Sequence, residues 1–158
     1  MPASAQVRPN IRLRPVAAED AALLFDWLNR PDSLAASLDT STPVAWDAHK
    51  SWFDTRLSDP RTRIWVVEQD AAPVGAVRLQ DKGDGPEVAI YIGAPVRGAG
   101  VAASALGLAL DEAQFVWPGS EVIARVRPDN AASRRLFERA GFAQRNRADD
   151  QLIYVFTL

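Results

Sequence analysis

The chain has 158 residues, of which 47% are hydrophobic and 24% charged, and its formal net charge is -2. This length allows one domain with a sizeable core and is too short for two ordinary domains. The composition is typical of a globular protein rather than a disordered one. The charge balance offers no basic field for nucleic acid. Cysteine is absent, which excludes disulfides, thiolate nucleophiles and cysteine-based metal sites.

The N-terminal region is polar and short. Residues 1–10 contain no apolar stretch of the length that a signal peptide requires, and we expect them to be a flexible leader before a domain at 11–158. No segment approaches the roughly 20 apolar residues that span a bilayer. We therefore expect a cytoplasmic protein without a membrane or nucleic-acid partner, either a monomer or a homodimer.

The first predicted elements are a strand and two helices. Residues 11–14 alternate apolar and polar side chains, which is typical of a half-buried strand, and Pro15 ends it. Apolar residues recur at helical spacing from 18 to 29 and again from about 46 to 57. The sequence therefore predicts two helices before the main run of strands.

The later elements mix strands and helices. Three strands joined by turns rich in Asp, Gly and Pro predict an antiparallel meander. A helix that ends at Gly141 has the glycine expected at a left-handed stop. In chain order the expected segments are strands at 64–68, 74–79 and 87–92, a helix at 101–115, a strand at 121–126, a helix at 131–140, and strands at 142–145 and 152–158. This order predicts one mixed α/β domain of the α+β type.

A glycine-rich loop lies between the strand that ends at Ile92 and the helix that begins near Val101. The run 97–102 reads RGAGVA. Small residues allow close backbone approach, and the N–H groups and positive dipole end of the following helix favour an anion. The loop predicts a phosphate or pyrophosphate site, and the alternative is a glycine-rich turn without a ligand.

Two nucleotide motifs fit the same letters. Gly98-x-Gly100-x-x-Ala103 matches a dinucleotide fingerprint, whereas Arg97-x-x-Gly100-x-Ala102 matches a pyrophosphate loop of another kind. A dinucleotide fingerprint follows the first strand of a βαβ unit and precedes an acidic residue about 20 positions on. Here three antiparallel strands are expected first, and the next strand ends in arginines, so the second motif is favoured.

A second motif lies about 30 residues further on, where 127–142 reads RPDNAASRRLFERAGF. It resembles the segment of GNAT acetyltransferases in which an Asn, a Ser three residues later, an aromatic residue and a Gly-Phe pair recur. Together with the Arg-x-x-Gly-x-Ala loop, this similarity covers about residues 10–158. The resemblance implies a single GNAT-like domain with a largely antiparallel sheet of six to seven strands, splayed at the coenzyme A site, and about four helices.

The resemblance also implies an activity and a set of binding residues. The chain would transfer acetyl from acetyl-CoA, with no metal, to a primary amine. The strand that ends at Ile92 would separate from the strand at 121–126, and the pantetheine arm would pair with its free backbone. The residues that the resemblance assigns to the cofactor are Ile90, Tyr91, Ile92, Arg97, Gly98, Ala99, Gly100, Val101, Ala102, Asn130, Ser133, Arg134, Phe137 and Arg139. Asn130 also fits a helix N-cap.

The proton carriers are few. Many family members have a Tyr as a proposed general acid at the position of Phe137, which has no proton to donate. His49, the only histidine, is one candidate, although a lone histidine on an aromatic helix face is more often packed. Glu87, at the start of the central strand, is the alternative base, and Tyr91 is a candidate acid. The alternatives for Glu87 and Tyr91 are a solvated strand end and a packed ring.

The early helices are expected to shape the acceptor pocket. Trp27, Trp52 and Phe53 are the candidate substrate residues. The patterns His49-x-x-Trp52-Phe53, Trp27-Leu28-Asn29 and Ser37-Leu38-Asp39-Thr40 are similar to a GNAT subgroup linked to surface-polysaccharide and amino-sugar acetylation. An amino sugar, possibly nucleotide-linked, is therefore the favoured acceptor. The alternatives are a protein α-amino group and a coenzyme A-binding module without catalysis.

Overall fold

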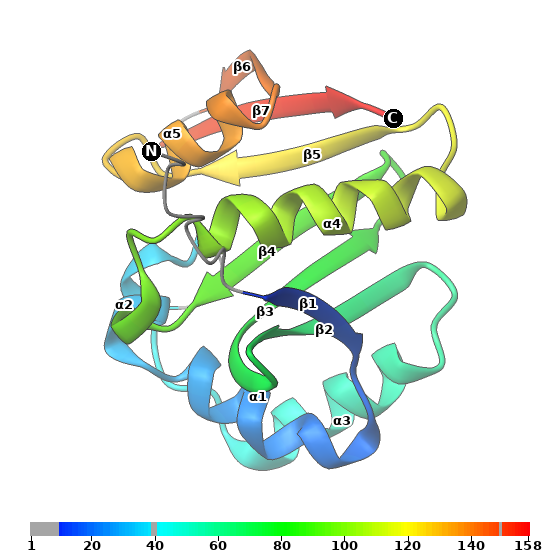
Figure 1. Cartoon of the computed structure of the whole chain (residues 1–158), viewed down its shortest axis with the longest axis vertical. Coiled ribbons are helices and arrows are strands. Elements are labelled where there is room, and N and C mark those ends of the chain that lie inside the picture. The colour runs from blue at the N-terminus through cyan, green and yellow to red at the C-terminus, as the bar shows by residue number, and fades with distance from the viewer. Residues whose placement is uncertain (1–9, 39–40, 149) are drawn as a thin grey trace, which may run out of the picture.

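The computed structural model describes residues 10–38, 41–148 and 150–158, so most of the predicted leader and the motif residues Asp39 and Thr40 lie outside the described residues. The described chain forms one mixed sheet with helices on both faces (Figure 1). Its elements are β1 (Ile11–Pro15), η1 (Ala18–Asp20), α1 (Ala21–Leu28), α2 (Pro31–Ala36), α3 (Trp46–Leu57), β2 (Thr62–Gln69), β3 (Ala72–Asp81), β4 (Pro86–Ile92), η2 (Ala94–Val96), α4 (Val101–Val116), β5 (Glu121–Val126), α5 (Ala131–Arg139), β6 (Ala143–Ala148) and β7 (Gln151–Thr157).

The expected fold class and element order are confirmed, with one helix more than predicted. The additional element is α2, a helix of six residues with Pro31 in its first turn. Proline fits the first turn of a helix, where its missing N–H has no acceptor to lose. Pro31 also lies just beyond the helix predicted at 18–29, a place where proline is common. Six residues are also too few to show a helical repeat of apolar side chains.

The sheet has seven strands in the order β1-β2-β3-β4-β5-β7-β6. Every neighbouring pair is antiparallel except β4 and β5, which are parallel. The predicted meander is β2, β3 and β4, in which Val77 of β3 pairs with Trp65 on one side and Ile90 on the other. The parallel pair therefore lies at the centre of the sheet, between two antiparallel halves.

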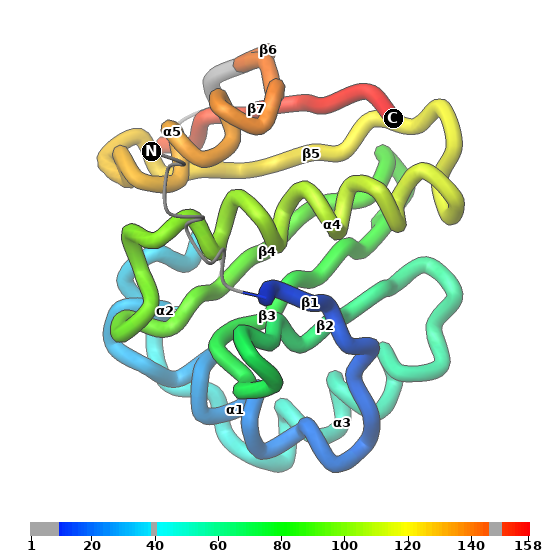
Figure 2. Tube along the Cα trace, in the orientation of Figure 1, coloured from blue at the N-terminus to red at the C-terminus, as the bar shows by residue number. Residues whose placement is uncertain are grey.

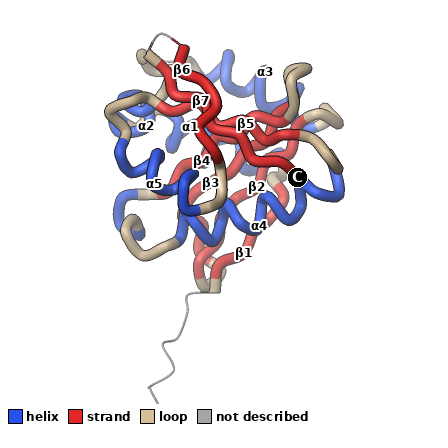
Figure 3. The backbone as a smooth tube through the Cα atoms, turned by 90° about the horizontal axis from the view of Figure 1, so that it is seen from above, coloured by secondary structure: helices blue, strands red, loops and turns tan. Residues whose placement is uncertain are grey.

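Helices pack on both faces of the sheet. Figure 3 shows α4 and α3 on opposite sides of the strands. The core under α4 contains Val67, Val88 and Leu106, and all three side chains are buried. On the other face, Val66 and Phe53 of α3 are fully buried. Because β2 is covered on both faces, its apolar run lacks the alternation of a half-exposed strand.

The described residues contain no helix that is long and apolar enough to cross a membrane.

Candidate active site

The parallel strands β4 and β5 diverge from one end to the other. Within the described chain their only residue pair is Glu87 with Ile123, close to the start of β4. Beyond this pair the two strands separate toward their C-terminal ends, as Figure 1 shows. The expected splay of the sheet is therefore confirmed, and it lies at the carboxyl ends of two parallel strands, where open α/β sheets bind ligands.

The divergence directs backbone groups of β4 into the gap. The N–H of Gly93 donates to the carbonyl of Val74 in β3 at 2.8 Å. Because the peptide is trans, the carbonyl of Ile92 points in the opposite direction, toward the gap. Alternate residues of a strand direct their backbone groups to the same side, so Ile90 also faces the gap. Backbone groups in such a position need a partner, and an extended ligand with amides supplies it.

The glycine loop follows β4 and η2 and leads directly into α4. Gly98 and Gly100 have φ values of 82° and 79°, in the left-handed region that other residues avoid. Gly100 precedes α4, and no side chain of the described residues caps that helix. The first N–H groups of α4 have no acceptor within the helix and lie at the positive end of its dipole. These observations fit an anionic ligand such as a pyrophosphate.

A groove of about 770 Å³ begins at this loop and follows the outer face of α4. Its walls are mostly small residues, which leave space beside the helix. The lining residues are Asn10, Ile11, Ala99, Gly100, Val101, Ala103, Ser104, Gly107, Leu108 and Asp111. The loop residues Ala99 and Gly100 thus border a volume large enough for part of a nucleotide.

Arg97 joins this loop to α2. Its Nε donates to the carbonyl of Ile92 at 2.7 Å, and its guanidinium pairs with Asp32 of α2. The same guanidinium lies over the ring of Tyr91, 5.6 Å from the ring centroid. The hydrogen bond from Arg97 holds the pKa of the Asp32 carboxyl below its usual value. Sequence reasoning missed Asp32, and its only signal was an acidic residue one position after a helix-starting proline.

Tyr91 lies between the gap and α1. The rings of Tyr91 and Trp27 have centroids 5.8 Å apart, so the structure brings together a predicted catalytic residue and a predicted substrate residue. Burial raises the pKa of the Tyr91 phenol above its ordinary value, and the nearby Asp32 carboxylate adds to this. Tyr91 is therefore protonated at neutral pH.

Glu87 occupies the narrow end of the gap. Its Oε1 accepts a hydrogen bond from Nε of Arg125 in β5 at 2.7 Å, and about a quarter of each side chain is exposed. Ile90 lies three residues further along β4, about 10 Å away at the rise of a strand. Glu87 is thus an ion-paired carboxylate beside the gap, and a proton can reach it from the open end only through water.

His49 and Phe53 lie inside the interface between α1 and α3. His49 is 3% exposed, and its Nε2 is 2.9 Å from the carbonyl of Ala21. Its ring stacks on Phe53 with centroids 6.0 Å apart, and Phe53 is completely buried. Burial lowers the pKa of His49. The geometry favours the packed alternative for both residues, and their roles in catalysis and substrate binding stay untested predictions.

Trp52 differs from these two neighbours because it is only half-buried. The guanidinium groups of Arg78 and Arg56 lie over its ring, 5.1 and 5.9 Å from the centroid. Arg78 faces the same side of the sheet as Tyr91, because it pairs with Ala89 of β4.

The second sequence motif forms the turn into α5. The Oδ1 of Asn130 accepts the N–H of Ser133 at 3.1 Å, so the expected N-cap is confirmed. Arg134 donates to the carbonyl of Pro128, and Arg139 is exposed. Phe137 is 4% exposed and packs against Phe142 with ring centroids 5.1 Å apart. The position of the usual Tyr therefore holds a core residue here.

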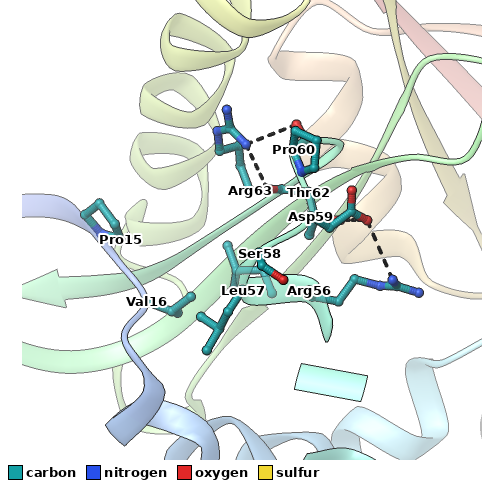
Figure 4. A pocket seen from close by; sticks show the side chains of 10 residues that line it. Pro15, Val16, Arg56, Leu57, Ser58, Asp59, Pro60, Thr62 and Arg63 are labelled. Carbon is teal, nitrogen blue, oxygen red and sulfur yellow. Dashed lines mark hydrogen bonds and ion pairs between the residues drawn. The ribbon is translucent and has the colours of Figure 1, made fainter. Parts of the chain in front are cut away.

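A second hollow lies at the opposite end of the sheet, where β2 begins. It measures about 270 Å³ and is bordered by the end of α3 and by β1 (Figure 4). Its charged side chains bind within the chain: Arg63 donates to the carbonyls of Pro60 and Thr62, and Arg56 pairs with Asp59. None of the described residues that line this hollow lies on β4 or β5.

Comparisons with known proteins agree with this fold. The family model described as "Acetyltransferase (GNAT) domain" matches residues 10–143. A domain from Methanocaldococcus jannaschii superposes with a TM-score of 0.84 at 24% identity, covering 95% of this chain and 99% of the other. Spermidine N-acetyltransferase from Vibrio cholerae, solved with CoA and spermine, gives 0.80 at 18% identity and 94% coverage of both chains. The yncA protein of Salmonella typhimurium, solved with acetyl-CoA, gives 0.77 at 19% identity and 93% coverage of both.

No functionally curated protein matches the sequence. Fold, site and family model together define an acetyltransferase that uses acetyl-CoA. The chain belongs to the GNAT acetyltransferase family. The family assignment does not extend to the amino-sugar subgroup, which none of the three structural neighbours supports.

The loop assignment predicts that Gly100→Asp weakens the binding of CoA at least about tenfold. Like charges about 4 Å apart repel by roughly 1–4 kcal/mol, and the new carboxylate would face the pyrophosphate. Isothermal titration with CoA measures the effect. Gly119→Asp is the matched control, because Gly119 has a φ of 78° and equally open surroundings but lies in the turn between α4 and β5. Equal CoA affinity in the two variants would contradict the assignment.

The packing of His49 predicts a stability that falls in mild acid. Its folded pKa lies below its value in the unfolded chain, so the unfolded state binds more protons as the pH drops below about 6.5. The free energy of unfolding then decreases by up to about 1.4 kcal/mol per pH unit. Urea titrations between pH 5 and 8 measure this. Because His49 is the only histidine, His49→Gln should flatten the profile, and an unchanged slope would refute the cause.

Proposed function

We propose that the chain acetylates the primary amine of a small molecule that binds beside Trp27 and Tyr91, with an amino sugar as the favoured acceptor. The observation that carries the proposal is the gap between β4 and β5, which is open at the end where Ile90, Ile92 and the glycine loop meet. The helices α1 and α2 border this end, so an acceptor that enters beside them meets the gap at the side opposite to α4.

Charge around the gap supports an acceptor with little positive charge of its own. Among the described residues, three carboxylates on elements that border the gap are paired: Asp32 with Arg97, Glu87 with Arg125 and Asp129 with Arg127. A polyamine carries several ammonium groups, and its binding needs an excess of carboxylates. The spermidine acetyltransferase of Vibrio cholerae has a similar fold, but at 18% identity its substrate is a weaker guide than the charges of this chain.

The residues of the chain divide the chemistry among them. Bound acetyl-CoA supplies a thioester carbonyl, which the neutral amine attacks. The N–H groups of Ile90 and Ile92 face the gap and donate to the oxygen on which negative charge develops. The protonated Tyr91 phenol is available to the leaving thiolate, although a thiol with a pKa of about 8.5 needs little assistance. Glu87 accepts a proton of the substrate ammonium through water before the attack, and the proton that the nitrogen loses on forming the amide replaces the one that Tyr91 gives to the thiolate.

An acceptor screen tests the proposal directly. We expect thiol release from acetyl-CoA to be fastest with an amino sugar such as glucosamine, with kcat/KM at least about tenfold higher than with spermidine, a difference of about 1.4 kcal/mol. A peptide with a free α-amino group is the third acceptor. A preference for spermidine or for the peptide would overturn the favoured acceptor, and no turnover with any amine despite CoA binding would support a non-catalytic module.

The role of Glu87 predicts a loss of turnover. Glu87→Gln retains an oxygen for Arg125 but removes the proton acceptor, so kcat should fall by about 10²-fold with little change in KM, which steady-state thiol release measures. Glu121→Gln is the matched control: Glu121 also begins a strand and pairs with an arginine, Arg145, but this pair is exposed and lies at the start of β5. If Glu87→Gln keeps the wild-type kcat, the ammonium loses its proton by another route.

A further inference from the structure

The guanidinium of Arg97 occupies a site built for a cation. Three kinds of group that bind cations surround it: the carboxylate of Asp32, the carbonyl oxygen of Ile92 and the face of the Tyr91 ring. A carboxylate and a carbonyl accept hydrogen bonds from an ammonium as they do from a guanidinium. An aromatic face attracts either cation. Nothing in this set requires the cation to be an arginine.

The cation site lies at the open end of the gap. The carbonyl of Ile92 points away from β3, because the N–H of Gly93 donates to Val74. Tyr91 precedes Ile92 on β4, and its ring contacts Trp27 of the acceptor side. A cation in this position is therefore next to the backbone groups that the proposed reaction uses.

The short helix α2 holds Asp32 in place across the mouth of the gap. It is anchored to α1, because the Oγ of Ser33 donates to the carbonyl of Trp27 at 2.6 Å. At its other end the carbonyl of Ser37 accepts a hydrogen bond from Arg127, which follows β5, at 3.2 Å. The tube of Figure 2 shows α2 beside the loop that follows β4. Asp32 thus keeps its position if Arg97 leaves.

An anion bound at the glycine loop would also attract the guanidinium of Arg97. Arg97 is the first residue of the glycine loop, which directs N–H groups and the positive end of α4 toward an anion. Guanidinium pairs with phosphate oxygens in a strong bidentate geometry, whereas a partly exposed pair such as Asp32–Arg97 contributes little. An anion at the loop therefore competes effectively with Asp32 for the guanidinium.

We propose that Asp32, the carbonyl of Ile92 and the ring of Tyr91 bind the ammonium group of the acceptor, and that Arg97 fills this site until CoA draws it away. The inference rests on the proposed function and deepens it, because it names the residues that recognise the amine before it loses its proton. CoA then binds first, and each molecule of CoA opens one amine site. The binding of CoA therefore raises the affinity for the amine, and the amine raises the affinity for CoA by the same factor.

The variant Asp32→Asn gives opposite effects on the two ligands. Loss of the ion pair frees Arg97, so CoA should bind about 1.5- to 5-fold more tightly, the range of an exposed pair. Loss of the carboxylate should weaken the binding of propylammonium, the probe for the amine site, at least about tenfold in the presence of CoA, because a hydrogen bond to a charged group is removed. Isothermal titration measures both affinities. A merely structural role for Asp32 would weaken both ligands together.

A second measurement follows Arg97 itself. In the wild-type protein, saturating CoA should shift the Nε–H resonance of Arg97 and lower the Kd of propylammonium at least about tenfold. Asp26→Asn is the matched control, because it breaks the exposed Asp26–Arg30 pair one helix earlier and should leave both affinities unchanged. An unshifted resonance, or propylammonium binding that ignores CoA, would overturn the inference. These binding measurements need no turnover, so their failure is distinct from failure of the acceptor screen.

Discussion

Two parallel strands that separate leave backbone N–H and C=O groups without a neighbour, and such groups require a partner. In this chain the separation begins after the single pair of Glu87 with Ile123. Groups on both sides of the gap are placed to act as partners. On one side the glycine loop and α4 supply N–H groups for a charged ligand. On the other side the side chain of Arg97 donates to the carbonyl of Ile92 in place of a ligand.

Each end of the open gap has an ion pair between a carboxylate and an arginine. Asp32 and Glu87 each pair with an arginine of another element. Asp32 pairs with Arg97, which follows β4, and Glu87 pairs with Arg125 of β5. The Glu87–Arg125 pair connects the strands where they still touch, and the Asp32–Arg97 pair connects the loop to α2 where the strands are furthest apart. The two pairs therefore lie at opposite ends of the gap between β4 and β5. Only the second has a guanidinium that a phosphate can attract.

The sequence indicated the backbone geometry of the glycine loop and of the Asn130 cap more fully than the side-chain contacts near α1 and α2. The loop, the cap and the strand alternation are local patterns, so neighbouring residues are enough to indicate their conformation. Asp32 carried no such pattern, because its role depends on Arg97, which is 65 residues away in the chain. His49 and Phe53 share a helix face with Trp52, yet burial by α1 separates them from it, and periodicity alone does not say which element covers a face. The six-residue α2 was missed because a helix of that length shows no repeat.

The difference between backbone features and side-chain features also limits what structural similarity at low sequence identity shows. In the proposed site the donor half consists of backbone groups, a helix terminus and two glycines, which need only the fold to be retained. A TM-score of 0.84 at 24% identity shows the shared fold alone. The proposed acceptor half consists of the side chains of Trp27, Asp32 and Tyr91, and each of these can change without a change of fold. At Phe137, where the resemblance to GNAT acetyltransferases leads us to expect a Tyr, the chain has a buried ring. In the proposed function the identity of the acceptor depends on side chains of α1, α2 and the end of β4, and it has to be established from their chemistry.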